Sequence, residues 1–322
     1  MLGLGEGACH GAAVLSLNAD SILAAAITGS AHCNGEHVVG IEVGPALIRA
    51  GVFGREGELL GKTKLSTKLE RGPDAVLARV ERCVAYAADE CDLVPGKLRG
   101  VGIGLPGQLV DGEVRVSSAL GWHGLEVQRI LAERLCLPVA AANAYNLAAS
   151  AIAVQEFPTL ARPLVVLFAG SEIGVAVLLE QGWATLDAPG VSSLLQLPDE
   201  NVLHTMPASE FSGFRGRDFR KAIRAGSTAA REFVLQSVHI AAEAGENLCQ
   251  HFGAKTLVLA GGALDEVRDE VLKLVQARVT SRVASTILST ILVSRLGEAA
   301  SLAGAGWVAR GLIHQIFQPA RY

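Results

Sequence analysis

The chain has 322 residues, more than one hydrophobic core usually serves, so its length predicts two domains. Half of the residues are hydrophobic and only 19% are charged, which excludes an intrinsically disordered protein. The net charge of −4 and the pI near 6.1 exclude a basic surface for nucleic acid.

Residues 1–37 are rich in glycine, alanine and small polar residues, and we expect a poorly ordered leader there. The first 48 residues contain no lysine or arginine, so the basic region of a secretory signal is absent. No apolar run reaches the roughly 18 residues that cross a bilayer. We therefore expect no membrane partner and a cytoplasmic protein.

From His37 the sequence predicts a run of strands. Residues 38–44 and 46–53 are apolar segments separated by a glycine, which favours a hairpin. The turn Gly54-Arg-Glu-Gly57 leads into a third strand over residues 58–65.

Helices and strands then alternate. Apolar residues recur with helical spacing in residues 74–89, and residues 98–105 form an apolar strand that ends at Pro106-Gly107. A helix over residues 125–135 precedes the strand and Ala-rich helix start in Leu137-Pro-Val-Ala-Ala-Ala-Asn-Ala-Tyr-Asn-Leu-Ala-Ala149. This alternation predicts an α/β fold.

The second half repeats the pattern of the first. Residues 164–179 read as strand, glycine turn and strand, like a degenerate copy of residues 38–53. Helix is expected over most of residues 214–252, a buried strand over 256–260 and an amphipathic helix over 265–281. We expect an N-terminal lobe at 38–148 and a C-terminal lobe at 149–322, with the last helix packing back on the first lobe.

Four motifs in this order resemble the ROK family of sugar kinases, glucokinases and sugar-responsive repressors. They are Gly102-Ile-Gly-Leu-Pro-Gly107, Asn143-Ala-Tyr-Asn146, Ala169-Gly-Ser-Glu-Ile-Gly174 and Val258-Leu-Ala-Gly-Gly262. The resemblance spans about residues 38–312. It implies a two-lobed actin-like (ribonuclease H-like, sugar kinase) fold, an inter-lobe cleft for nucleotide and sugar, and a homo-oligomer.

The residue that acts as the base in the family is missing here. The family pattern is Asn-Asp-Ala-Asn, whose aspartate is the catalytic base, and Ala144 stands at that position. No carboxylate lies within ten positions of Ala144 on either side, so a local replacement is not expected. We therefore predict no catalytic residue.

Both phosphate turns also depart from the family. The first is Asp-x-Gly-Gly-Thr in the family and Glu42-Val-Gly-Pro-Ala46 here, where Pro45 lacks an N–H donor. The second reads Gly170-Ser-Glu-Ile-Gly-Val-Ala176, which places Glu172 where backbone amides should meet an anion. Glu172 should weaken nucleotide binding.

No zinc is expected. The family's zinc cluster of cysteines has no counterpart, because residues 183–225 contain no cysteine and only His204. The cysteines lack metal spacing, and in a chain of this length they are expected to be reduced thiols. They are Cys9, Cys33, Cys83, Cys91, Cys136 and Cys249.

The resemblance nevertheless assigns candidate positions. Those for substrate are Gly104, Gly107, Asn143 and Asn146. Those for a cofactor are Glu42, Gly44, Gly170, Ser171, Gly261 and Gly262. For the glycines the alternative is a tight turn or close packing, and for the two asparagines it is helix capping.

Three functions remain open. The first is a non-catalytic ROK-like protein that senses a small sugar, regulates or assembles, with no cofactor. The second is an active ATP- and Mg²⁺-dependent hexose kinase with a displaced base. The third is a transcriptional regulator without its DNA-binding domain, since residues 1–37 are too short for a winged helix and hold no cationic recognition helix.

Overall fold

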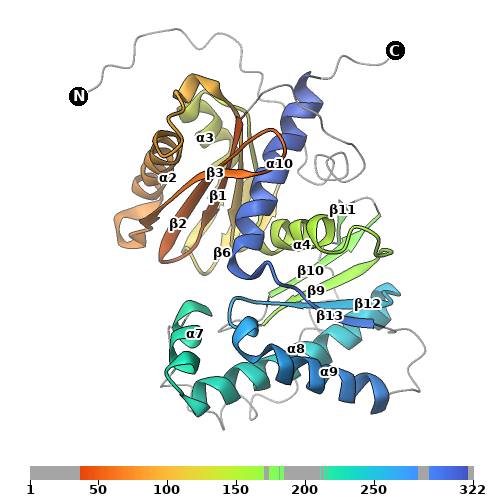
Figure 1. The fold of residues 1–322 in the computed structure, drawn as a ribbon. Coiled ribbons are helices and arrows are strands. Elements are labelled where there is room, and N and C mark those ends of the chain that lie inside the picture. Colours follow the sequence, from red (N-terminus) through yellow and green to blue (C-terminus); the bar gives the residue numbers. More distant parts are fainter. Residues whose placement is uncertain are drawn as a thin grey trace, which may run out of the picture. The chain divides into compact units, whose positions relative to one another are not determined.

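The computed structural model describes residues 37–169, 174–180, 182–184, 211, 214, 216–281 and 290–317 (Figure 1). Apart from His37, the expected leader lies outside these residues. The chain divides into two compact units: Met1–Leu147 together with Leu302–Tyr322, and Ala148–Ser301. The chain passes from one unit to the other within helices α4 and α10, and we describe each unit by itself.

Unit 1 is built on a five-stranded sheet with the order β3-β2-β1-β4-β8. Strands β1, β2 and β3 form an antiparallel meander, and β4 and β8 run parallel to β1. This arrangement confirms the predicted hairpin and the third strand. The strands are β1 (His37–Val43), β2 (Leu47–Phe53), β3 (Leu59–Ser66), β4 (Leu98–Leu105) and β8 (Val139–Asn143).

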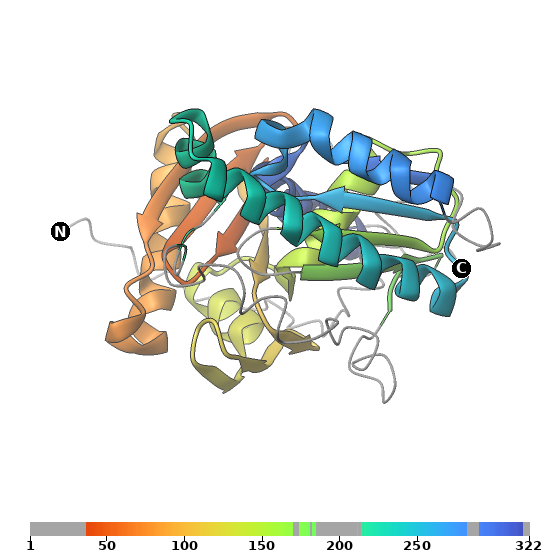
Figure 2. The same cartoon turned by 90° about the horizontal axis from the view of Figure 1, so that it is seen from below.

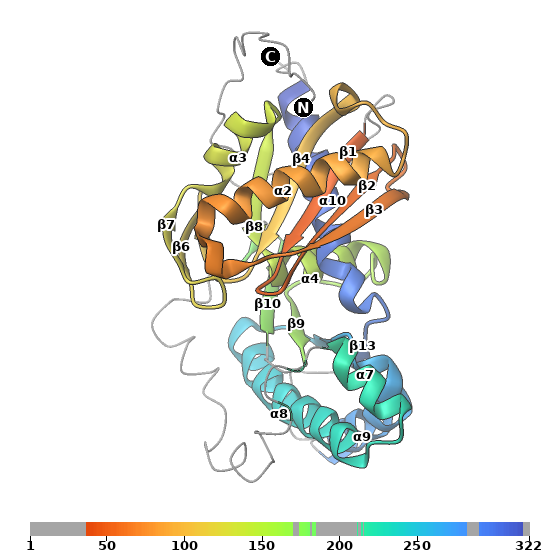
Figure 3. The same cartoon turned by 90° about the vertical axis from the view of Figure 1, so that its left-hand side faces the viewer.

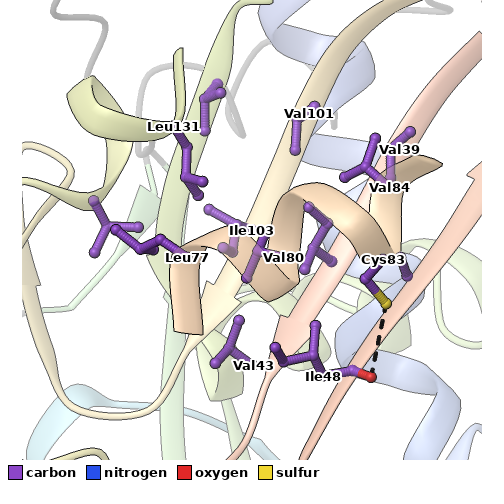
Figure 4. Close-up of a cluster of buried hydrophobic side chains, with 14 of the residues drawn as sticks. Val39, Val43, Ile48, Leu77, Val80, Cys83, Val84, Val101, Ile103 and Leu131 are labelled. Atoms are coloured by element: carbon purple, nitrogen blue, oxygen red, sulfur yellow. Dashed lines mark hydrogen bonds between the residues drawn. The ribbon is translucent and has the colours of Figure 1, made fainter. Parts of the chain in front are cut away.

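Helices cover both faces of this sheet. Figure 3 shows α2 (Gly72–Asp89) and α3 (Val127–Leu135) in front of the strands and α10 (Ala300–Phe317) behind them. On the α2 side, alternate strand residues such as Ile41 and Ile103 are fully buried. They pack against the apolar stripe of α2, which includes Val80 (Figure 4). The helical spacing of the apolar residues on α2 is what the sequence predicted.

On the other face, the backbone of α10 lies directly on the sheet. A Cβ atom on Gly102 would come within 1.9 Å of the Ala305 carbonyl oxygen, and one on Gly40 within 2.7 Å of the Gly306 nitrogen. Glycine is therefore required on the strands so that the helix backbone can approach. The buried guanidinium of Arg310 also donates hydrogen bonds to the carbonyls of Gly54 and Arg55, fixing α10 to the β2–β3 turn.

A small antiparallel sheet lies between β4 and α3 in the sequence. Its strands are β5 (Gln108–Val110), β6 (Glu113–Ser117) and β7 (Trp122–Leu125). The sequence pattern does not predict these three short strands.

Unit 2 repeats the plan of unit 1. Its five-stranded sheet has the order β11-β10-β9-β12-β13, again a meander next to two parallel strands. The two strands predicted within residues 164–179 are confirmed as β9 and β10, and the glycine turn expected between them lies outside the described residues. The strands are β11 (Gly182–Trp183), β10 (Gly174–Leu179), β9 (Leu164–Phe168), β12 (Thr256–Ala260) and β13 (Thr290–Val293).

The helices of unit 2 follow the prediction with one break. Helix was expected over most of residues 214–252, and the structure has α7 (Gly216–Arg224) and α8 (Thr228–Phe252). Gly226 separates them at φ +90°, and the Ser227 side chain caps α8 by accepting a hydrogen bond from the Ala230 N–H. Figure 2 shows α8 beside α9 (Arg268–Ser281) on one face of the strands. Within the described residues, no helix is long and apolar enough to cross a membrane.

Candidate functional site

The parallel strands of unit 1 bring several predicted site residues to one edge of the sheet. Glu42 on β1 pairs with Gly104 on β4, which pairs with Ala142 on β8, and Asn143 follows opposite Leu105. These are the carboxyl ends of the strands, where ligands bind in open α/β sheets. Helix α4 (Ala144–Gln155) starts at this edge.

Asn143 holds the start of α4. Its side-chain oxygen accepts hydrogen bonds from the backbone N–H groups of Tyr145 (2.8 Å) and Asn146 (3.3 Å), as a helix N-cap does. Its amide nitrogen donates to the Gly107 carbonyl at 2.7 Å. The capping alternative is therefore realised, and the second N–H of the amide is the group that could still donate to a ligand.

Ala144 is the first residue of α4, directly after this cap. Its side chain is a half-buried methyl group. Asn146 lies half-buried two positions further along the same helical turn. The helix start therefore presents amides at this edge, which bind hydroxyl groups but do not take up a proton near neutral pH.

The two glycines assigned to the substrate have structural reasons to be glycine. Gly107 has φ +111°, and a Cβ atom there would lie 2.4 Å from the Val116 carbonyl oxygen. Gly104 is buried between Glu42 and Ala142 in the sheet. The fold alone therefore explains both residues.

Glu42 forms an ion pair with Arg49. Arg49 is its partner across the β1–β2 hairpin, and its Nη2 lies 2.9 Å from Oε1 of Glu42. The side chains are 17% exposed for Glu42 and 32% exposed for Arg49. A carboxylate removed from water to this extent needs a counter-charge, and the guanidinium provides it.

The turn between β1 and β2 is closed by its own hydrogen bonds. The Gly44 N–H donates to the Leu47 carbonyl at 2.9 Å. Thr67, whose side chain is fully buried, donates from Oγ1 to the Gly44 carbonyl at 2.6 Å and from its N–H to the Ala46 carbonyl at 3.0 Å. Since Pro45 has no N–H, two of the three turn residues offer no free amide to a phosphate.

In unit 2, side chains pack over the carboxyl end of β12. The Gly262 carbonyl accepts a hydrogen bond from Nη1 of Arg220 at 2.7 Å. Nη2 of Arg220 lies 3.4 Å from Oε1 of Glu298, and a Cβ atom on Gly262 would meet Cγ of Glu298 at 2.6 Å. Protein atoms therefore occupy the space directly beside Gly262.

Gly261 is also in close contact with the sheet. It has φ +149°, and a Cβ atom there would lie 2.1 Å from the Ala169 carbonyl oxygen at the end of β9. Gly170, Ser171 and Glu172, which follow Ala169, lie outside the described residues. Of the cofactor candidates in unit 2, the structure thus places Gly261 and Gly262 together at one sheet edge.

Sequence reasoning missed Arg49, Thr67, Arg220 and Glu298. Arg49 had a signal, because a hairpin centred on Pro45 and Ala46 places it opposite Glu42. Arg220 and Glu298 had none, because they are far apart in the sequence and meet only in the folded unit.

The structure describes four of the cysteines. Cys83, Cys91, Cys136 and Cys249 are not joined in disulfide bonds. Burial raises the pKa of the Cys83 thiol to about 11 and that of Cys249 to about 12, so both are protonated and unreactive near neutral pH. In the part of the chain that the structure describes, no three His, Cys, Asp or Glu side chains gather as a metal site would require.

Comparison with known proteins gives a family match and a set of similar folds. Residues 38–185 match the model of the ROK family. The fold is similar to a ROK family glucokinase from Streptomyces griseus in complex with glucose and AMPPNP, with 20% identity, TM-score 0.61 and coverage of 85% of this chain and 99% of that chain. It is also similar to the ROK hexokinase from Thermus thermophilus (23% identity, TM-score 0.60, 85% and 97% coverage).

A third similar structure is a ROK family transcriptional regulator, a homolog of the E. coli MLC protein. It shows 16% identity and TM-score 0.62 over 87% of this chain and 79% of that chain. A search of curated proteins finds no match. At these identities the structures establish the fold, and the predicted α/β fold of the actin-like sugar kinases is confirmed.

Proposed function

Since the chain belongs to the ROK family, whose model matches residues 38–185, we propose that it is a member without sugar kinase activity. Its role is to sense a small sugar, to regulate or to assemble with other proteins. In this proposal the ligand-binding fold is retained and the group that would activate a sugar hydroxyl is lost.

The observation that carries this proposal is Ala144 at the start of α4. Transfer of a phosphoryl group to a hydroxyl needs a base within about 2.6–3.2 Å of the proton that it removes. The carboxyl end of β8 offers instead a methyl group next to the amide of Asn143. That amide is already engaged with the helix start and with Gly107.

Glu42 is the one carboxylate that β1, β4 and β8 carry, and its position does not suit it as a replacement. It lies two strands away from β8, which at the usual spacing is about 10 Å. It also pairs with Arg49 on β2, the strand on the side of β1 opposite to β8. A kinase that used Glu42 as base would have to break this ion pair.

The phosphate side supports the same proposal. The β1–β2 turn has Pro45 in place of an amide donor, and the Gly44 N–H is bonded within the turn. At β12, Arg220 and Glu298 fill the space beside Gly262. A phosphate group at the β1–β2 turn would have to displace the hydrogen bond from Gly44 to Leu47, and one beside Gly262 would have to displace Arg220 or Glu298.

Two observations favour other readings within the family. Similarity to the two sugar kinases favours an active ATP- and Mg²⁺-dependent hexose kinase, with a base supplied from elsewhere in the chain. Similarity to the transcriptional regulator favours regulation among the non-catalytic roles. A sugar ligand fits both, since one similar ROK structure holds glucose and another is described in complex with sucrose.

The deciding experiment is a coupled assay of ADP release with ATP, Mg²⁺ and a panel of hexoses and N-acetylhexosamines. We expect no hexose-dependent turnover, while an active hexokinase added to the same mixture must give signal. Ala144→Asp should also remain inactive, since the turn at Pro45 is unchanged. Wild-type turnover in the common range of about 1–10³ s⁻¹ would overturn the proposal.

A further inference from the structure

The strands β1, β2 and β3 are neighbours in the sheet of unit 1 (Figure 1). One row of charged residues lies across them. Glu42 pairs with Arg49, and Arg49 pairs with Lys64. Direct partners in antiparallel strands point to the same face of the sheet, so the three side chains share one face. Lys62 lies two positions before Lys64 on β3 and shares that face.

This row carries an excess of positive charge. Arg49 neutralises Glu42 at 2.9 Å. Lys62 and Lys64 are exposed. One carboxylate against three cations leaves a net charge of +2, and the ion pair keeps the only negative charge of the row from opposing an anion.

Backbone donors contribute little beside this row. The Gly44 N–H is bonded to Leu47 and Pro45 has none. An anion at this end of the sheet would therefore be held by side chains. Lysine binds phosphate as a point charge, and a phosphate monoester carries about −1.5 to −2 charges at pH 7, close to the excess of the row.

We propose that Lys64, next to the Glu42–Arg49 pair, forms a binding site for a phosphate monoester that needs no divalent cation. Arg49 takes the part that a metal ion would otherwise play, because it cancels the carboxylate charge from within the chain. This inference rests on the proposed function, because a kinase site would have to admit a metal-bound nucleotide, whereas the site proposed here needs no metal. Arg49 is a positioning residue in this site, and Lys64 contacts the ligand.

The site is tested by calorimetric titration of the full chain with glucose 6-phosphate, inorganic phosphate and glucose, each in EDTA and in Mg²⁺. We expect glucose 6-phosphate to bind equally, within twofold, in both buffers. Binding of inorganic phosphate with the same affinity would place recognition in the phosphate alone, and weaker binding would place part of it in the sugar. Both results support the site, whereas no heat with either phosphate compound overturns it.

Two exposed lysines give a matched pair of variants. Lys64→Gln should weaken binding about tenfold. Lys97→Gln removes an exposed lysine that precedes β4, at the opposite end of the sheet, and should leave binding unchanged. Lysines on an edge strand such as β3 also discourage pairing between sheets. If that were the whole role of Lys64, both variants would bind like the wild type, and the inference would be wrong.

Arg49 has its own readout. Arg49→Gln uncovers the charge of Glu42, so we expect it to weaken binding at least tenfold in EDTA and to recover when Mg²⁺ is added. The double variant Glu42→Gln/Arg49→Gln removes both charges and should bind without metal again, and it keeps the test valid if the single variant fails to fold. Wild-type binding that requires Mg²⁺, or Arg49→Gln that binds normally in EDTA, contradicts the inference. Because these titrations contain no ATP, their failure leaves the turnover result of the proposed function untouched.

Discussion

Replacing Asn143 by alanine should destabilise unit 1, because the Asn143 side chain both caps α4 and bonds to Gly107. The side chain caps α4 through Tyr145 and Asn146 and ties Gly107 to the same point. Loss of an N-cap costs about 1 kcal/mol, and loss of a hydrogen bond costs about 1 kcal/mol. Asn143→Ala should therefore lower the free energy of unfolding by about 2 kcal/mol, or the melting temperature by about 4–8 °C.

Asn143→Ser is the matched control. Serine is also a good N-cap, so this variant keeps the helix start and loses mainly the bond to Gly107. The free energy of unfolding of Asn143→Ser should be lower than that of the wild type by about 1 kcal/mol, half the loss of the alanine variant. Urea unfolding monitored by circular dichroism measures both values. Equal losses in the two variants would mean that capping contributes nothing, and an alanine variant within about 0.5 kcal/mol of the wild type would refute the reasoning as a whole.

Three further predictions concern other parts of the chain. Glu172→Gly should bind MgATP more tightly than the wild type in a calorimetric titration, because like charges at about 4 Å repel by roughly 1–4 kcal/mol. Equal or weaker binding would show that the Glu172 side chain does not block the site. Gly102→Ala should lower the free energy of unfolding by about 3 kcal/mol or more, because its methyl group would lie 1.9 Å from the Ala305 carbonyl oxygen, and unfolding in urea at the wild-type midpoint would contradict that contact. Burial raises the pKa of the Cys83 thiol from 9.0 to about 11, so the unfolded chain releases this proton first and stability is lost as the pH rises from about 9 to 11. Cys83→Ala should lose less stability than the wild type between pH 9 and 11, as measured by the melting temperature. An equal fall in melting temperature for both proteins would refute this.

Much of the fold followed from local patterns. The apolar runs on both sides of Gly44 predicted a hairpin, and their repetition at residues 164–179 predicted the second one, because strand periodicity and glycine turns are properties of short segments. β13 was not predicted, since its four residues carry no period of their own. The contact of Gly102 with α10 could not be predicted, because it joins residues about two hundred positions apart.

The site was predictable in part, for the same reason. That Ala144 stands where a base would be needed is visible in the chain, and so was capping as an alternative for Asn143. The tie from Asn143 to Gly107 depends on how β4 and β8 pair, and the contact between Arg220 and Glu298 depends on the packing of α7. Arg49 lies between these cases, because the hairpin register alone places it opposite Glu42.

The most direct measurement is a single-turnover reaction with γ-labelled ATP, Mg²⁺ and hexose, with the protein in excess over the nucleotide. Under these conditions even slow transfer accumulates, so product release cannot hide it. Loss of the base at Ala144 predicts that no labelled sugar phosphate forms above a protein-free control. Transfer of label that depends on both hexose and protein would contradict the central claim, because it would show that the chain supplies a base from a position other than the start of α4.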